Sequence, residues 1–350
     1  MFLLLFCKGK KKKEKDKYEP VILKNPKKII QHLHLGTFLP IRKDLKKYIK
    51  QDLLLAKAES LVLIYEGEKV GHFLYLMDLA KSIFYFGYFK VKNDDKRLIK
   101  LLLDQLKKIA KQRNCKVIRG PINIPTILYG WGFMEEHSDT TLSLGKPINP
   151  PIYQKIFLDS GFYVKFEEIT WEGRMVKINP LQIPKYDFTD YQYVNPKDRE
   201  HLNQLKPVIL SLHAKNLPPS ARITPDIEGS FDNYTDFVLD FGKLYMFFFV
   251  RHLPSDKIIA CGTSFPNIFS TDEEEKFNHL IYYSWVVHPE HRRKGLALYM
   301  YGLTSSKARK DGYKIISGPI AKDNNANISL AQKFGTEHTR THLILEKIVK

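Results

Sequence analysis

A short basic turn holds the residues of this chain best suited to chemistry. Residues 288–300 read HPEHRRKGLALYM, and Arg292, Arg293 and Lys294 stand directly before Gly295. An apolar, helix-like run begins at the glycine. The start of a helix presents unpaired N–H groups and the positive end of the helix dipole, and glycine lets a ligand approach the backbone closely. The turn is therefore typical of a phosphate cradle, and a basic surface turn without a ligand is the alternative.

The elements on either side must position this turn. Residues 280–287, LIYYSWVV, read as a strand that ends just before Pro289, and Ala297 leaves the first helical turn uncrowded. We expect successive backbone N–H groups to hold a pyrophosphate while the cations add charge. The residues expected to form the cradle are Arg292, Arg293, Lys294, Gly295, Leu296 and Ala297.

The same arrangement occurs twice in the chain. Residues 91–122 and 287–320 both begin with a valine and pass through a charged turn into a helical pattern, and both end in a short strand followed by Gly-Pro-Ile. Each is preceded by a hydrophobic hairpin, at 60–78 and 244–265, and followed by a similar helical segment, at 149–162 and 324–335. This repetition predicts two copies of one α/β unit.

We place the two copies at 25–178 and 186–350, with a proline-containing linker at 176–188. The turn of the first copy has no glycine and carries Asp94 and Asp95, whose charge would repel a pyrophosphate. Long loops of the first copy are expected either to line a cleft between the copies or to cover it. Their polar and aromatic residues include Asn123, Tyr129, Trp131, Asn149 and Tyr153.

Composition limits the class of protein. The 350 residues are 43% hydrophobic and 27% charged, which is a folding composition. Three cysteines without a CxxC motif indicate neither a disulfide framework nor a zinc site, so we expect a cytoplasmic protein without a metal. The net charge of +18 is compatible with nucleic acid, an anionic membrane or an acidic ligand, or with a lysine-rich proteome alone.

The first 24 residues are expected to form a mostly disordered basic tail. Their apolar start, MFLLLF, is too short for a transmembrane helix or a signal-peptide core, and the charges follow it instead of preceding it. We therefore expect no transmembrane segment. A membrane-surface role with Cys7 as an acylation site is the alternative.

Two motifs of the second copy resemble those of a known superfamily. Arg-x-x-Gly-x-Ala after a strand ending in Val-x-Pro resembles motif A of the GNAT acyl-CoA N-acyltransferases, and NNANISLAQKFG at 324–335 resembles their motif B. The resemblance covers most of 186–350. The segments GPINIPTILYGWGF, PINPPIYQKIFLDSGF and THLILEK are similar to tandem GNAT proteins in which a degenerate N-terminal copy precedes an intact C-terminal one. The resemblance implies an α+β fold of two tandem three-layer domains, each with a mixed, mostly antiparallel sheet flanked by helices.

The same resemblance implies transfer of an acyl group from acetyl-CoA, or another acyl-CoA, to an amine of a small molecule or peptide. It implies one CoA site, in the second copy. We expect the pantetheine along Trp285, Val286 and Val287, and motif B contributes Asn324. A backbone N–H at the splayed fourth strand, which we place at 258–267, is expected to polarise the thioester carbonyl.

The general base has two candidates. His279 opens the strand of the basic turn and histidine has a suitable pKa, while Tyr283 alternates with Tyr282 on that strand, so that one of the two tyrosines faces the cleft. Core or surface packing is the alternative for each. Many GNAT members carry an acidic tyrosine in motif B where this chain has Ala331. Water or another residue must then protonate the thiolate, or the domain only binds CoA.

A second class of function stays open at this point. The same fold could serve as a non-catalytic module that binds CoA or a polyanion such as RNA, as the positive charge suggests. No RNA-binding motif accompanies that charge. The acceptor and the oligomeric state have no sequence signal.

Overall fold

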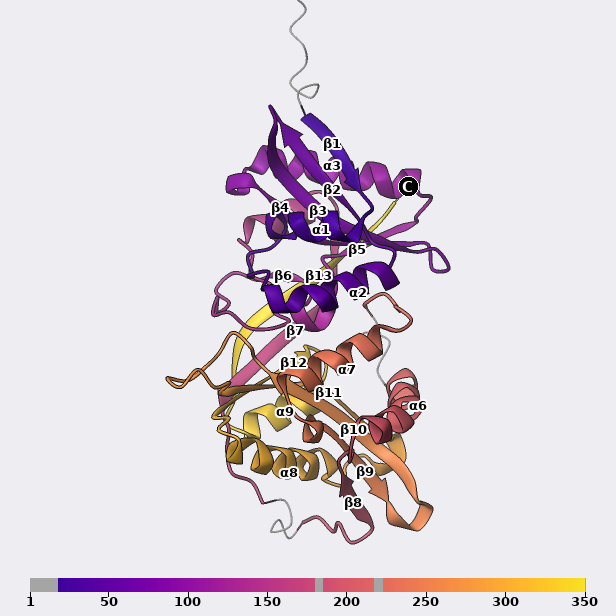
Figure 1. Cartoon of the computed structure of the whole chain (residues 1–350), viewed down its shortest axis with the longest axis vertical. Helices are drawn as coiled ribbons and strands as arrows, with labels where there is room; N and C mark the ends of the chain where they lie inside the picture. The colour runs from indigo at the N-terminus through magenta and orange to yellow at the C-terminus, as the bar shows by residue number, and fades with distance from the viewer. Residues whose placement is uncertain (1–17, 180–184, 217–222, 350) are drawn as a thin grey trace, which may run out of the picture.

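The structure is a computed structural model, which describes residues 18–179, 185–216 and 223–349. Thirteen strands in these residues form one sheet with helices on both faces (Figure 1). The strand order is β1-β2-β3-β4-β5-β13-β7-β12-β11-β10-β9-β8, and β6 pairs with β13 off this path. Strands β4 and β5 are parallel, as are β11 and β12, and the other neighbours along the path are antiparallel. The predicted α+β class with a mixed, mostly antiparallel sheet is confirmed.

The first half of the chain contains strands β1 to β7 and helices α1 to α5. Their bounds are β1 Tyr18–Leu23, α1 Pro26–His32, α2 Lys46–Leu55, β2 Glu59–Tyr65, β3 Glu68–Asp78, β4 Ile83–Val91, α3 Lys96–Gln112, β5 Val117–Gly120, α4 Thr126–Tyr129, β6 Phe133–Met134, α5 Ile152–Asp159 and β7 Tyr163–Arg174.

The second half contains the remaining elements. Their bounds are β8 Tyr191–Val194, α6 Arg199–Asn216, α7 Ser230–Phe241, β9 Phe247–His252, β10 Lys257–Pro266, β11 His279–Val287, α8 Leu296–Lys310, β12 Ile315–Ala321, α9 Asn325–Lys333 and β13 Glu337–Ile348. Within the described residues, no helix is both long and apolar enough to cross a membrane.

The internal repeat corresponds to a repeated βαβ unit. Strand β4, helix α3 and strand β5 form the first unit, and β11, α8 and β12 form the second. The two parallel ladders start at equivalent places, Ile83 opposite Val117 and His279 opposite Ile315. The two helices also end alike, because Asn114 and Gly312 follow them with positive φ angles of 55° and 96°.

Apolar stripes fix which face each helix covers. Helix α3 buries Ile99, Leu102 and Leu106 in a cluster that also contains Phe157 of α5. The opposite face of the first half carries α1 and α2, whose buried residues belong to a second cluster that continues into the second half. The core is therefore continuous between the halves on one side of the sheet.

The two halves exchange their last strands. Strand β13 lies between β5 and β7, so the end of the chain completes the sheet of the first half. Strand β7 pairs along its other edge with β12 of the second half. Figure 1 shows β7 and β13 running between the halves, and the C-terminus lies beside the first half. The domain limits placed on either side of the linker stay a prediction. The sheet itself is continuous and does not divide at the linker.

One part of the predicted tail was wrong. Residues 18–23 form β1, an edge strand whose residues pair with β2 from Tyr18 opposite Tyr65 to Leu23 opposite Ser60. The Tyr18 and Tyr65 rings stack 4.7 Å apart, which gives this strand an aromatic anchor that the sequence analysis missed. The rest of the tail, including Cys7, lies outside the described residues.

The exchanged strand should make the stability of the first half depend on the end of the chain. Leu345 of β13 is fully buried among first-half residues. We predict that Leu345→Ala lowers the free energy of unfolding by about 2–4 kcal/mol, because it leaves a cavity in that core. The control is Ile348→Ala on the same strand, where the side chain is 61% exposed and the change should stay within about 0.5 kcal/mol. Urea denaturation measures both, and equal effects of the two variants would contradict the assignment of β13 to the first core.

Candidate functional site

The basic turn leaves the start of a long helix uncapped. Strand β11 ends at Val287, a 3₁₀ turn follows at Pro289–His291, and α8 begins at Leu296. Its N-cap residue is Gly295, with φ +78°, and within residues 18–179, 185–216 and 223–349 no side chain accepts a hydrogen bond from the first N–H groups. Arg293 also has a positive φ, +63°. Gly295 is left-handed and is followed directly by the right-handed residues of α8, and such a pair makes a concave nest of N–H groups that favours an anion.

The three cations of the turn have different surroundings. All three are exposed. The Arg292 guanidinium donates to Val287 O at 3.0 Å and to Asn216 O at 3.4 Å, so it ties the turn to the end of α6. Arg293 and Lys294 are the cations better placed to meet a ligand in solution.

Gly295 is required by its surroundings as well as by its backbone angle. A Cβ atom at this position would lie 2.6 Å from the ring of Tyr186, a residue of the predicted linker. Tyr186 packs near Phe188, which stacks on Tyr299 of α8 with the ring centroids 4.6 Å apart. An aromatic stack from the linker therefore holds the glycine turn in place, a contact with no signal in the sequence.

The equivalent helix start in the first half is already occupied. Asp95 is the N-cap of α3, and its Oδ1 accepts from Arg97 N at 2.7 Å and from Leu98 N at 3.3 Å. Its neighbour Asp94 accepts a hydrogen bond of 2.6 Å from the hydroxyl of Tyr153. The carboxylate of Asp95 thus takes the N–H groups that a phosphate would need. The charges of Asp94 and Asp95 were expected to repel a phosphate at this turn. The structure shows in addition that Asp95 already accepts hydrogen bonds from the N–H groups there.

Strands β11 and β12 separate close to the turn. Their ladder consists of three residue pairs and ends at Ile281 opposite Ser317. A pocket lies where they part, between these strands, α8, α9 and β7. The side chains and backbone that line it belong to Trp171, Tyr282, Tyr283, Ser284, Trp285, Tyr301, Ile316, Ser317, Gly318, Pro319, Ile320, Asn327, Leu330, Ala331, Phe334 and Thr336.

The predicted location of the splayed strand was wrong. Residues 258–267 correspond to β10, which pairs with β9 on one edge and with β11 on the other from Ala260 to Pro266. That strand has no open edge at the site. The strand with a splayed end is β11, one position further along the sheet.

The corresponding gap in the first half is filled by protein. Asn123 Oδ1 accepts from Tyr88 N at 2.6 Å, and Asn123 Nδ2 donates to Tyr129 O at 2.9 Å. Ile122 N donates to Phe86 O at 2.6 Å, and a Cβ at Gly87 would lie 2.0 Å from Ile122 O. The loop after β5 therefore closes the space between β4 and β5. The expectation was that these loops line or cover a cleft between the two copies, and the contacts found here instead close a gap within the first half.

The predicted pantetheine strand presents its residues to different sides. Trp285 packs against Tyr282 and Tyr301 on the side of α8, with ring centroids 5.0 and 6.4 Å away. Val286 is buried opposite Cys261, and Val287 pairs with Ala260. Among these three residues only Trp285 lines the pocket.

Motif B forms the outer wall of the pocket. Asn324 is the N-cap of α9, and its side chain accepts from Asn327 N at 3.2 Å, so its side chain holds the helix start. Asn327, Leu330 and Ala331 of this helix line the pocket. Asn327 was missed by the sequence analysis, although its position one turn into motif B is a usable signal.

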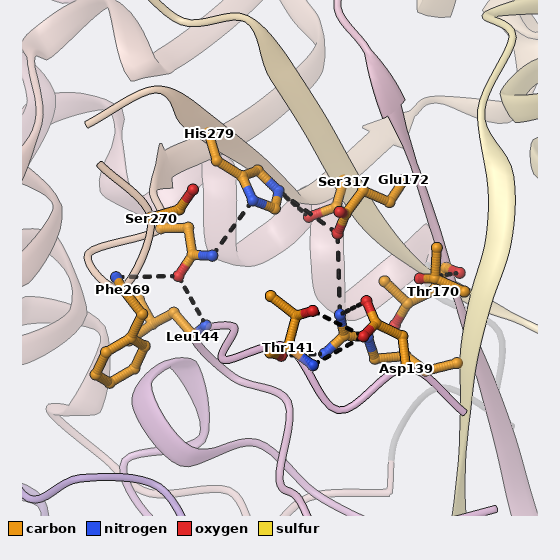
Figure 2. A network of polar contacts seen from close by, with 12 residues as sticks. Asp139, Thr141, Leu144, Thr170, Glu172, Phe269, Ser270, His279 and Ser317 are labelled. Atoms are coloured by element: carbon orange, nitrogen blue, oxygen red, sulfur yellow. Dashed lines mark hydrogen bonds and ion pairs between the residues drawn. The ribbon is translucent and has the colours of Figure 1, made fainter. Parts of the chain in front are cut away.

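His279 lies in a polar network at the junction of the halves. Its Nε2 is 2.8 Å from Ser317 Oγ and 3.9 Å from a Glu172 carboxylate oxygen, and Figure 2 shows the imidazole directed toward both. Its Nδ1 accepts from Asn267 Nδ2 at 3.3 Å. Both ring nitrogens are thus engaged and the side chain is buried. Burial, with the charge of Arg340, lowers the pKa of His279 to about 4. Because both ring nitrogens already have hydrogen-bond partners, His279 has a poor geometry for a general base.

The rest of this network links the two exchanged strands to the loop before α5. Arg340 of β13 is buried and pairs with Asp139 at 3.0 Å, while its Nη1 donates to Thr141 O at 2.9 Å. Glu172 of β7 lies 4.0 Å from the same guanidinium. Burial of Glu172 raises its pKa, and Arg340 acts in the opposite direction. The network therefore fixes β7 and β13 behind β11.

Tyr283, the second candidate base, faces the interface of the halves. Its ring lies 5.8 Å from Tyr234 of α7 and 6.4 Å from Trp131 of the first half, measured between centroids. Burial raises its pKa to about 12. A phenol of this kind accepts a proton only as phenolate, so packing describes Tyr283 better than base chemistry.

Tyr282 and Tyr283 point to opposite faces of the sheet. Tyr282 faces Tyr301 of α8, and Tyr283 faces α7. Ser284 is on the side of α6, where its Oγ lies 2.5 Å from His213 Nε2. The sequence analysis missed His213 and Ser284, and also Trp171, because their contacts join segments far apart in the chain.

One histidine group beside the turn has the spacing of metal ligands. The ligand atoms of His288, Glu290 and His291 lie within 4.8 Å of one another. The three cations that follow would repel a divalent ion, and the Glu290 side chain is 81% exposed. The arrangement is better suited to an anion than to a metal.

A known family matches part of the second half of the chain. Residues 212–336 match the family described as "Acetyltransferase (GNAT) family". No curated protein sequence matches the chain.

Solved structures resemble the chain over nearly its whole length. A tandem GNAT protein from the clavulanic acid biosynthesis pathway superimposes with a TM-score of 0.57 at 12% identity, over 95% of this chain and 99% of that one. A GCN5-related N-acetyltransferase from Sphaerobacter thermophilus gives 0.57 at 8% identity, over 96% of each chain. A glucosamine N-acetyltransferase region of a fungal multi-domain β-N-acetylglucosaminidase gives 0.61 at 11% identity, over 94% of this chain and 38% of that one. At these identities the likeness is one of fold.

Burial of His279 should make folding sensitive to acid. An unfolded histidine titrates near its ordinary pKa of 6.5, and the folded pKa is about 4. The unfolded state therefore binds more protons between these values, and stability falls as the pH falls through that window. We predict that in His279→Gln the free energy of unfolding falls by on the order of 3 kcal/mol less over this pH window than in the unaltered protein. Unfolding by urea at several pH values measures the slope, and exposed His338→Gln is the control. An unchanged slope in His279→Gln would show that the buried imidazole is not the source.

Proposed function

We propose that this chain, a GNAT-superfamily protein with two tandem copies of the fold, is an N-acyltransferase that uses acetyl-CoA at one site in its second copy. The observation that carries the proposal is the contrast between two helix starts. Helix α8 has a glycine N-cap and, in the part of the chain that the structure describes, no side-chain partner for its first N–H groups, whereas Asp95 caps α3. An anion can therefore bind the first but must displace a carboxylate at the second.

The diphosphate of CoA fits the turn at Gly295. The nest formed around Arg293 and Gly295 supplies backbone N–H groups, and the helix dipole adds to their attraction. Arg293 and Lys294 are exposed and add charge without a competing ion pair in the described structure. The role of Arg292 in this proposal is to hold the turn, through its bonds to Val287 O and Asn216 O.

The thioester fits the gap between β11 and β12. Because the ladder ends at Ile281, backbone N–H groups further along β11 that face β12 have no ladder partner there. Such a group can polarise the thioester carbonyl as negative charge develops on its oxygen. Trp171 and Phe334 bound the pocket at this gap, which favours a short acyl group such as acetyl.

The acceptor is an amine that approaches from the α6 and α7 face. CoA would occupy the α8 and α9 side of the gap, so the opposite face is left for the nucleophile. The amine attacks in its neutral form, and a proton must leave its nitrogen as the C–S bond breaks. Ala331 occupies the place of the usual motif B tyrosine, so the thiolate takes its proton from another group. Small-molecule and peptide amines both fit this description.

A reducing compartment such as the cytoplasm suits the cysteines of the described chain. Cys115 and Cys261 are both free and buried. Burial raises the pKa of Cys261 to about 12, which keeps it an unreactive thiol.

Charge reversal at the turn tests the proposal. We predict that isothermal titration with acetyl-CoA gives one site per chain, and that Arg293→Glu with Lys294→Glu weakens binding at least tenfold, which corresponds to about 1.4 kcal/mol or more. The reason is loss of two attractive charges beside the diphosphate and gain of two repulsive ones. Both side chains are exposed, so the fold should be unaffected.

The matching turn of the first half provides the control. Lys96→Glu with Arg97→Glu reverses two cations at the start of α3 and should leave acetyl-CoA affinity unchanged, because Asp95 already occupies those N–H groups. Undiminished binding by the α8 variant, or two sites per chain in the unaltered protein, would overturn the proposed site.

A further inference from the structure

A histidine and a serine meet on the acceptor side of the proposed site. Ser284 lies on β11 in the stretch beyond the β11–β12 ladder and lines the pocket at the gap. His213 lies near the end of α6, a helix that packs on β10 and β11. Ser284 Oγ and His213 Nε2 are 2.5 Å apart. Both side chains are partly buried, so they are sheltered yet not sealed off.

The backbone of α6 decides which nitrogen of His213 is basic. Nδ1 lies 2.8 Å from Ile209 O, and a carbonyl oxygen can only accept a hydrogen bond. Nδ1 therefore carries the proton, and Nε2 has the free lone pair. The Ser284 hydroxyl is then the donor in the bond to Nε2. This is the arrangement in which an imidazole can take a proton from a hydroxyl.

The surroundings keep this imidazole neutral. Burial lowers the pKa of His213 from its ordinary value, and the bond from Nδ1 to Ile209 O opposes that shift in part. Cys261 Sγ lies 3.9 Å from Nδ1, but as a buried thiol it brings no charge. A neutral His213 can accept a proton at physiological pH.

The other titratable groups near the gap are less well arranged. His279 uses its free lone pair on Asn267 and its N–H on Ser317. Glu172 lies beside Arg340 in the network behind β11. Tyr283 would have to ionise first. Among the described residues close to the gap, His213 alone combines a basic ring nitrogen with a hydroxyl partner on a residue that lines the pocket.

We propose that Ser284 takes the proton of the acceptor amine and passes its own hydroxyl proton to His213. The inference rests on the proposed acyl transfer. The amine nitrogen forms a bond to the thioester carbon, and the resulting ammonium gives a proton to Ser284 Oγ as the Ser284 hydroxyl proton moves to His213 Nε2. The C–S bond then breaks. The imidazolium returns its proton through Ser284 to the CoA thiolate, which leaves as the thiol, so the enzyme ends unchanged and Ala331 needs no acidic substitute.

The test follows CoA thiol release from acetyl-CoA, with spermidine, glucosamine or a lysine-containing peptide as the amine, from about pH 5 to about pH 9. In the unaltered protein kcat/KM should fall as the pH is lowered through the depressed pKa of His213. His213→Gln should lower kcat about 100-fold and remove that limb of the profile. Ser284→Ala should lower kcat to a similar extent, and Ser284→Thr, which keeps the hydroxyl, should recover most of it.

Two measurements separate failure of this inference from failure of the proposed function. Acetyl-CoA affinity, measured by calorimetry, should be the same in all three variants, and His201→Gln on the same helix should change neither affinity nor rate. A His213→Gln protein that binds acetyl-CoA and keeps the original rate and pH profile overturns the relay alone. An unaltered protein that binds no acetyl-CoA, or binds it and releases no thiol with any amine, overturns the proposed function and the relay with it.

Discussion

The structure depends most on how each helix start satisfies its first N–H groups. These groups have no partner within the helix and must find an acceptor elsewhere. Helix α3 finds one in the carboxylate of Asp95, the residue directly before it. Helix α8 begins after Gly295, which offers no side chain, and the cations before the glycine attract an anion from solution. One repeated unit thus gives a helix capped by its own carboxylate in the first half, and in the second a glycine-capped helix, which is the proposed anion site.

The exchanged strands make the first half part of the second half's site. Strand β12 is held on one edge by β11 for only three residue pairs, whereas β7 pairs with it along seven positions from Ile315 to Ala321. The opening between β11 and β12 is therefore kept by a strand from the first half. Trp171 of that strand lines the pocket. In the first half, hydrogen bonds of Asn123 close the equivalent space between β4 and β5.

Local features were predictable from the sequence, and contacts between distant segments were not. The glycine turn, the repeat and the hairpins are set by short stretches of chain, and the structure has all of them. The exchange of β13 leaves no local signal, because a strand pattern does not name its partner. The contact between His213 and Ser284 was unpredictable for the same reason, because the two residues belong to different elements. Strand 258–267 was wrongly predicted to be the splayed strand. Which strand is splayed depends on where a parallel ladder ends, and the pattern of apolar residues does not reveal that position.

Amide hydrogen exchange tests the central claim most directly, since it reports on the backbone N–H groups themselves. On addition of CoA, the amides of residues 295–298 at the start of α8 should exchange more slowly, because the diphosphate accepts their hydrogen bonds. Amides 96–100 at the start of α3 should exchange at an unchanged rate. Slower exchange at α3, or no change at either helix at a saturating concentration of CoA, would contradict the account.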